Sequence, residues 1–307
     1  MKKVFLYAGQ GSQRVGMGLD FYKEYPDYRE FVDSIDTDID VKRLMHEGPV
    51  EELSRTENTQ VCMAVFAAGV TRLLSEHGVW PEAACGLSLG EYGALYAAGV
   101  FTTKQYIDVL RFRGKAMMEA SKGVESAMSA ILGCDSTIIS KVCERARSGY
   151  VTVANYNCPG QTVICGEEIA VAEVEEKLRN LGARRCVRLQ VSGPFHTLYM
   201  NAAGDALESC LRDMELQKPS IPVAMNATGT FAEEKNIKEL LVRQVESSVV
   251  LEQDLEALLD RGYSDFVEIG PGNTMAGFLK KTARAKGINV NVNSIDSTED
   301  FRKVIGK

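Results

Sequence analysis

The segment GLSLGEYGAL at residues 86–95, which sets a serine between two glycines, most constrains how this chain can fold. A short apolar run, Ala83-Ala84-Cys85, precedes it, and an alanine-rich stretch of helical character follows. A sharp strand-to-helix turn strains the backbone at its tip, and side chains at the flanking positions would collide with their neighbours, so glycine is favoured there. The GxSxG pattern therefore predicts a nucleophile elbow with Ser88 at its tip. A tight turn in which the serine only caps the helix is the alternative.

A serine hydroxyl is a weak nucleophile until a neighbouring base takes its proton, and histidine is the usual base. This chain has three histidines. His46 lies in a charged amphipathic stretch, and His77 lies in the last turn of a predicted helix, where it can interact with the helix dipole. His196 follows a predicted strand in the loop VSGPFHTLYM, and such strand-end loops carry the chemistry of α/β sheets. We predict that His196 is the base; a structural histidine is the alternative.

The chain divides into two blocks by the pattern of its predicted elements. Residues 126–191 follow the order β-α-β-β-α-β, which is the split arrangement of ferredoxin-like domains. Residues 1–125 and 192–307 contain strands and helices that suit a hydrolase-like domain with a parallel sheet. The predicted fold class is therefore α/β, with a hydrolase-like large domain that carries the elbow and a ferredoxin-like small domain inserted into it.

Composition and charge exclude several classes of function. The formal net charge of −7 predicts no general affinity for nucleic acid or for an anionic membrane surface. No apolar run reaches the roughly 18 residues that a membrane span needs, and the start of the chain is too weakly apolar for a signal peptide. The eight cysteines occur singly, without a CxxC pair, which favours free thiols in a reducing cytoplasm. Scattered histidines and lone cysteines predict no metal site.

The glycine-rich loop at residues 9–13, GQGSQ, follows the first predicted strand and invites a dinucleotide-binding interpretation. That interpretation fails because Arg14 stands where the GxGxxG pattern requires glycine, and no GK[ST] follows for a phosphate loop. A loop of small residues at the end of a parallel sheet can instead present a backbone N–H group to an oxyanion.

With these features the chain resembles the malonyl-CoA:acyl-carrier-protein transacylases of bacterial fatty acid synthesis and the acyltransferase domains of polyketide synthases. The resemblance covers essentially the whole length and implies the α/β fold with a ferredoxin-like insert. Its motifs are GQGSQ (9–13), TENTQ (56–60), GLSLGEYGAL (86–95), RFRGKAM (111–117), NYNCPGQTVICG (155–166), SGPFHT (192–197) and EIGPGNT (268–274).

The resemblance implies a role for each matching residue. Ser88 would attack the thioester of malonyl-CoA and His196 would take its proton, while the backbone N–H groups of Gln10 and Leu89 would form the oxyanion hole. Arg113 would hold the malonyl carboxylate, which a planar guanidinium matches with two parallel hydrogen bonds. An ion pair on a helix surface is the alternative for this arginine.

Further residues are implied to shape the pocket. Gln60 and Asn157 would line it, and Phe195, beside the histidine, goes with malonyl rather than branched donors in the family. Two departures bear on turnover and fine selectivity. Leu87 stands where the family usually has histidine, and Val250 aligns with a glutamine whose segment holds the second nitrogen of the histidine by a main-chain carbonyl. We expect Val250 to supply that carbonyl.

The implied reaction is a two-step transfer through a malonyl ester on the serine. It needs no permanently bound cofactor: malonyl-CoA is the donor, and the phosphopantetheine thiol of acyl carrier protein is the acceptor. We expect a cytoplasmic monomer without nucleic acid or membrane partners. Carrier proteins are acidic, so docking would use a local basic cluster, either residues 278–287 or the arginines at 184, 185 and 188.

Three other functions fit parts of the sequence. One is an acyltransferase for another acyl-CoA, such as acetyl, methylmalonyl or a longer chain. Another is a serine acyl-thioester hydrolase built on the same elbow. The third is a paralogue with little activity that binds carrier protein, which the departures at Leu87 and Val250 motivate.

Overall fold

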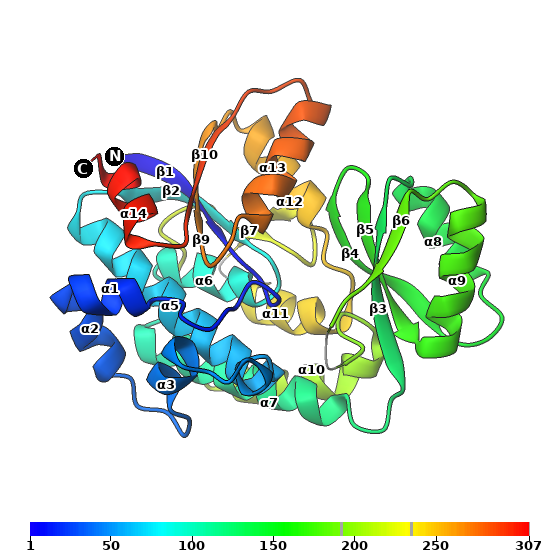
Figure 1. The fold of residues 1–307 in the computed structure, drawn as a ribbon, viewed down its shortest axis with the longest axis horizontal. Helices are drawn as coiled ribbons and strands as arrows, with labels where there is room; N and C mark the ends of the chain where they lie inside the picture. Colours follow the sequence, from blue (N-terminus) through cyan, green and yellow to red (C-terminus); the bar gives the residue numbers. More distant parts are fainter. Residues whose placement is uncertain (191–192, 234–235, 307) are drawn as a thin grey trace.

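The structure, a computed structural model, describes residues 1–190, 193–233 and 236–306 (Figure 1). Its larger sheet has four parallel strands in the order β10-β9-β1-β2. Parallel strands buried on both faces are the usual core of α/β proteins. The strands are β1 (Lys2–Tyr7), β2 (Trp80–Gly86), β9 (Asp265–Ile269) and β10 (Asn291–Ile295).

Successive residues of β1 point to opposite faces of this sheet, so two apolar clusters form, one on each side. Phe5 and Tyr7 pack with helices α5, α6 and α7, whereas Val4 and Leu6 pack with α12 and α13. The long helix α5 is apolar around most of its surface because other helices cover it. The helices of this part are α1 (Leu19–Glu24), α2 (Pro26–Asp33), α3 (Val41–His46), α4 (Val50–Leu53), α5 (Thr56–Glu76), α6 (Leu89–Ala97), α7 (Thr103–Ala120), the 3-10 turn η1 (Leu198–Met200), α10 (Asn201–Arg212), α11 (Ile237–Glu246), α12 (Leu251–Asp260), α13 (Thr274–Ala285) and α14 (Thr298–Ile305).

The second sheet is antiparallel, in the order β4-β5-β3-β6, and lies to one side of the first (green in Figure 1). Two helices cover one face of it, and the core between sheet and helices includes Ile131, Ile164 and Val174. Its elements follow one another as β3 (Ser126–Leu132), α8 (Ser136–Glu144), β4 (Val151–Cys158), β5 (Gln161–Glu167), α9 (Glu168–Asn180) and β6 (Arg185–Arg188).

This order and pairing confirm the predicted fold class, a hydrolase-like α/β core with a ferredoxin-like insert. The division into two domains stays a prediction, and its boundary between residues 191 and 192 lies outside the described residues. A further, two-residue pairing joins β7 (Ala224–Met225) with β8 (Thr230–Phe231). Within the described chain, no helix is both long and apolar enough to cross a membrane.

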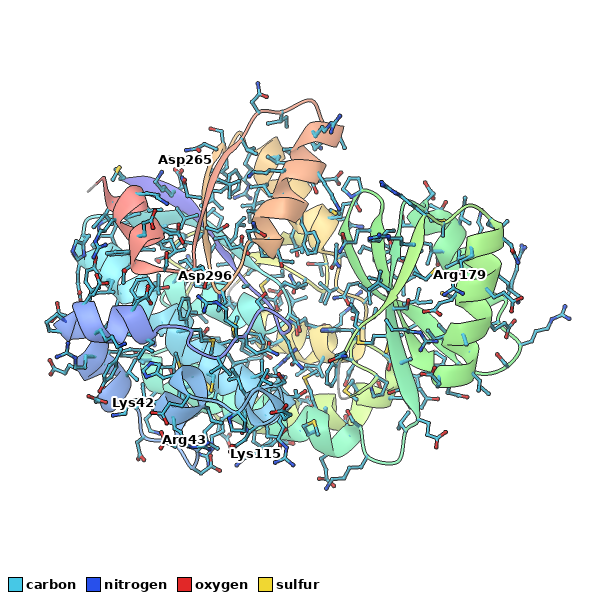
Figure 2. The ribbon with its side chains drawn as sticks, in the orientation of Figure 1. Lys42, Arg43, Lys115, Arg179, Asp265 and Asp296 are labelled. Carbon is cyan, nitrogen blue, oxygen red and sulfur yellow. The ribbon has the colours of Figure 1, made fainter. Side chains whose placement is uncertain are left out.

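Ion pairs lie around the outside of the molecule, where the labelled charged side chains of Figure 2 are found. Lys42 Nζ is 2.8 Å from Asp33 Oδ1, and Arg14 Nη2 is 2.8 Å from Asp296 Oδ1. Exposed pairs of this kind contribute little to stability because water and salt screen them. The two apolar clusters, rather than surface charge, therefore hold the larger sheet and its helices together.

The turn from β2 into α6 explains the two glycines of the GxSxG pattern. Ser88 adopts φ 54° and ψ −106°, a strained conformation for a residue with a side chain. A Cβ atom on Gly86 would lie 2.0 Å from the carbonyl carbon of Gly90, and one on Gly90 would lie 2.3 Å from the Tyr7 carbonyl oxygen. Without side chains at these positions, α6 packs directly on the ends of β1 and β2.

Replacing Gly90 by alanine should therefore lower the free energy of unfolding by at least about 2 kcal/mol, because backbone atoms of β1 would have to move. Gly277→Ala in α13 is the matched control: a Cβ atom there meets nothing within 4 Å, and the change should stabilise the helix by up to about 1 kcal/mol. Urea unfolding followed by circular dichroism measures both. Equal effects at the two positions would contradict the close-contact explanation.

Candidate active site

Three distant segments bring functional side chains together at the elbow. Ser88 Oγ lies 2.9 Å from His196 Nε2, across 108 residues of sequence, and accepts a hydrogen bond of 3.0 Å from Arg113 Nη2. His196 lies in the loop before η1 with φ 60°, and Arg113 lies within α7. The hydroxyl thus faces a base on one side and a cation on the other. This arrangement allows proton removal and stabilises the developing negative charge on Oγ.

The other nitrogen of the imidazole fixes which tautomer faces the serine. His196 Nδ1 lies 2.7 Å from the main-chain oxygen of Gln244. A carbonyl oxygen only accepts hydrogen bonds, so Nδ1 carries the proton and the lone pair of Nε2 points at Ser88 Oγ. This is the tautomer that a general base requires.

The expectation that Val250 supplies this carbonyl is wrong. The Val250 carbonyl already accepts hydrogen bonds from Gln253 N and Asp254 N in the first turn of α12. Gln244, by contrast, belongs to the last turn of α11, where helix carbonyls have no partner within the helix. The main-chain carbonyl at Nδ1 therefore comes from a glutamine that lies six residues before Val250.

His196 is buried, and its surroundings keep it neutral. Burial and the nearby Arg113 cation lower the pKa of His196 to about 4, although hydrogen bonds to the backbone partly oppose this. A pKa below neutrality means that Nε2 is unprotonated, and ready to accept a proton, at physiological pH.

Arg113 is only 1% exposed, and its hydrogen-bond acceptors are all neutral. Nη1 donates to Gln60 Oε1 at 2.9 Å, and Nη2 donates to Gln244 Oε1 at 3.0 Å as well as to the serine. Among the described residues, no carboxylate lies within salt-bridge distance of the guanidinium. Burial lowers the pKa of Arg113, but guanidinium groups stay charged in proteins. The site therefore holds a buried positive charge without a carboxylate partner.

A cavity of about 220 Å³ opens onto the serine. Half of the sixteen residues around it are apolar, and the other half are polar or charged. It is lined by Gln10, Leu87, Ser88, Arg113, Met117, Met128, Ala130, Asn155, Asn157, Gln161, Val163, Leu189, Phe195, His196, Thr274 and Phe278.

Two of the three predicted pocket residues lie where we expected them. Asn157 and Phe195 line the cavity, and Asn157 Oδ1 is buried without a hydrogen-bond partner among the described residues. Gln60 does not line the cavity: it contacts the guanidinium of Arg113 and donates to the Met117 sulfur at 3.4 Å. It supports the arginine from α5.

The two predicted oxyanion donors lie at the ends of neighbouring strands. Tyr7 of β1 pairs with Gly86 of β2, so the loop that holds Gln10 lies beside the elbow. Within the described chain, neither Gln10 N–H nor Leu89 N–H donates a hydrogen bond. Leu89 is the first residue of α6, where free N–H groups and the helix dipole favour negative charge.

Sequence reasoning missed three residues that surround the elbow. Asn226 Oδ1 accepts from Ser88 N at 2.7 Å, and its Nδ2 donates to the Gly86 carbonyl at 2.8 Å. Gln244 and Glu91 form a second set of contacts beneath the serine. Glu91 lies within the GLSLGE motif and Asn226 directly follows β7, so both positions carried a signal, namely a polar residue beside or within an apolar segment. No group of three histidine, cysteine or acidic residues in the described chain could hold a metal ion.

The elbow serine, the neutral histidine and the neighbouring N–H groups define the site of a serine acyl-transfer protein. Comparison with known proteins agrees. The family model for the acyl transferase domain matches residues 4–298, and the chain therefore belongs to the acyl transferase family.

Relatives and solved structures narrow this class. The chain is 38% identical to the malonyl CoA-acyl carrier protein transacylase of Bacillus subtilis over 288 residues, which is 92% of this chain and 91% of the relative. MCAT from Streptococcus pneumoniae superposes with a TM-score of 0.92 at 34% identity, covering 99% of both chains. A malonyl-transacylase solved in complex with its type II PKS acyl-carrier protein gives a TM-score of 0.93 at 31% identity, covering 100% of this chain and 99% of the other. The resemblance drawn from the motifs is thereby confirmed.

The lowered pKa of His196 predicts how serine reactivity depends on pH. Because the imidazole gains its proton only as pH falls through about 4, Ser88 should stay reactive well below pH 6.5 and lose reactivity near the lower value. Labelling of Ser88 with a fluorophosphonate, followed across pH with circular dichroism as a folding check, measures this. In Arg113→Met the midpoint should move upward, because the cation that disfavours imidazolium is gone. A midpoint near 6.5 in the unmodified protein would contradict this account.

Proposed function

We propose that the protein transfers a malonyl group from malonyl-CoA to the phosphopantetheine thiol of an acyl carrier protein, through an ester on Ser88. The observation that carries this proposal is the buried Arg113, which has no carboxylate partner among the described residues and lies 3.0 Å from the serine oxygen. A malonyl ester on that oxygen places its free carboxylate a few ångströms away, within reach of the guanidinium. A planar guanidinium binds such a carboxylate through parallel hydrogen bonds.

The first half of the reaction loads the serine. His196 Nε2 takes the hydroxyl proton as Oγ attacks the thioester carbonyl carbon, and the N–H groups of Gln10 and Leu89 stabilise the resulting oxyanion. The C–S bond then breaks, and the CoA sulfur leaves with the proton from Nε2. The serine now carries the malonyl ester.

The second half repeats these steps with another thiol. Nε2 takes the proton of the phosphopantetheine thiol, whose sulfur attacks the ester carbonyl. Oγ is the leaving group and regains its proton from the imidazole. The small volume of the cavity, half of whose lining residues are apolar, supports transfer over hydrolysis, because little room is left for water beside the ester. Phe195 at the cavity wall favours an unbranched donor.

The acceptor follows from the relatives and from charge. A structural neighbour is solved with its acyl-carrier protein. Of the two basic clusters, the one on α13 lies beside the cavity, because Lys281 Nζ donates to Gln161 Oε1 at 3.1 Å and Gln161 lines the cavity. Arg188, in the other cluster, pairs with Glu168 and Glu175. We therefore assign carrier docking to the α13 cluster.

We further propose that the protein acts in fatty acid synthesis in the cytoplasm, as a monomer without a permanently bound cofactor. The relatives named as malonyl CoA-acyl carrier protein transacylases support the substrate pair.

Incubation with malonyl-CoA should leave a malonyl adduct on Ser88, seen by peptide mass spectrometry and absent from Ser88→Ala. In Arg113→Met, kcat/KM for malonyl transfer should fall about 10- to 100-fold, the value of one lost charge-assisted contact. Transfer from acetyl-CoA, which has no carboxylate, should change by only a few-fold.

Other outcomes identify the alternatives. Rapid loss of the acyl group to water without a carrier protein would indicate a hydrolase. An unmodified Ser88 would indicate a carrier-binding protein without turnover. An equal loss for both donors in Arg113→Met would remove the assignment of the arginine to the malonyl carboxylate.

A further inference from the structure

A buried carboxyl group that the mechanism does not use lies beneath the serine. Glu91, in the first turn of α6, is 0% exposed. One of its oxygens accepts from the main-chain N–H of Asn226, and the other accepts from Gln244 Nε2 at 3.1 Å. Burying a carboxyl group costs free energy unless the group is well hydrogen-bonded, so these contacts are needed to offset the cost of burying Glu91.

Gln244 connects this carboxyl group to the cation of the active site. Its Nε2 also donates to the Ser88 carbonyl at 2.8 Å, and its Oε1 accepts from Arg113 Nη2 at 3.0 Å. A side-chain amide has an acceptor end and a donor end, so only one of its two orientations places oxygen against the guanidinium. The reversed orientation would turn an NH₂ group toward the cation.

Glu91 is the group that can enforce the correct orientation. The Ser88 carbonyl, the other acceptor for Gln244 Nε2, is shared with the helical N–H of Glu91 itself. Both carboxyl oxygens receive donors, which is the pattern of a carboxylate. Burial raises the pKa of Glu91 to about 8, against the opposing effects of the Asn226 N–H, Arg113 and the Gln244 amide. We take the ionised form from the hydrogen-bond geometry, because among the described residues neither oxygen faces an acceptor for a carboxyl proton.

We propose that Glu91 is a positioning residue for malonyl selectivity: it holds the Gln244 amide so that Oε1 faces Arg113 and aims the guanidinium at the acyl group. Glu91 acts through Gln244 and does not touch the substrate. This inference rests on the proposed malonyl transfer, and it adds a residue that sets the donor preference of the same site.

The test compares kcat/KM for malonyl-CoA and acetyl-CoA in Glu91→Gln. The new amide keeps the size of the side chain, but its NH₂ group must face either Asn226 N–H or Gln244 Nε2, so one donor loses its acceptor. The malonyl-to-acetyl ratio should fall about 10-fold or more, because only the malonyl donor uses the guanidinium. General damage to the fold would lower kcat/KM equally for both donors and leave their ratio unchanged.

Glu175→Gln is the matched control. Glu175 is another buried glutamate, on α9 of the small sheet, and it accepts from Arg179, which Figure 2 labels, and from Arg188. The substitution replaces a carboxyl group by an amide in the same way as Glu91→Gln does. Glu175 itself contacts neither Gln244 nor Arg113. The malonyl-to-acetyl ratio of this variant should equal that of the unmodified protein.

A second variant tests the route through Gln244. Gln244→Met removes the amide but keeps the main-chain oxygen that faces His196, and it should lower the ratio as much as Glu91→Gln does. The double variant should match Gln244→Met, because both changes act on one contact. If Glu91→Gln fails to fold, an unchanged ratio in Gln244→Met alone overturns the proposal.

The outcomes separate two failures. An unmodified protein that transfers no malonyl group contradicts the proposed function. An unmodified protein that transfers malonyl, with an unchanged ratio in Glu91→Gln or with additive effects in the double variant, contradicts the role of Glu91 alone.

Discussion

The direct contact of α6 with the ends of β1 and β2 is the constraint on which the site depends. Gly90 lies against the Tyr7 carbonyl, so close that no Cβ atom fits between them. Because of this contact, the chain turns sharply at Ser88, which adopts its strained conformation between the end of β2 and the start of α6. The contact also places the first N–H groups of α6 beside the loop of Gln10, where an oxyanion would form. One packing contact therefore positions both the nucleophile and the N–H groups that would bind the oxyanion.

The buried cation of Arg113 links substrate binding to the protonation state of the base. Its acceptors, Gln60, Gln244 and Ser88, are neutral and therefore do not cancel its charge. The same charge contributes to the lowered pKa of His196. A carboxylate in place of either glutamine would neutralise the arginine and favour imidazolium. Neutral acceptors thus keep the cation available for an anionic acyl group and leave the imidazole free to take a proton.

The parts of the fold and site that follow from local patterns could be predicted from the sequence. The elbow, the split β-α-β-β-α-β insert and the position of His196 all rest on spacing within one segment. The partner of His196 Nδ1 could not be predicted in this way, because it depends on where α11 ends. A helix end frees the carbonyl of Gln244, whereas the start of α12 engages that of Val250. Gln60 was misplaced for a similar reason, since the packing of α5 on α7 directs it to the arginine rather than to the cavity.

The helix end also explains how a main-chain carbonyl can take the place of an acidic group beside the histidine, where no acidic partner is found among the described residues. An aspartate at Nδ1 would stabilise imidazolium and raise the pKa of His196, working against the effects of burial and of Arg113. A carbonyl at the C-terminus of α11 selects the same tautomer with only the partial negative charge of a helix end. The acidic group near the site, Glu91, is instead placed on the far side of Gln244, where it supports the arginine without contacting the imidazole. One glutamine, Gln244, thus orients both groups. Its main-chain oxygen orients His196, and its side-chain amide orients Arg113.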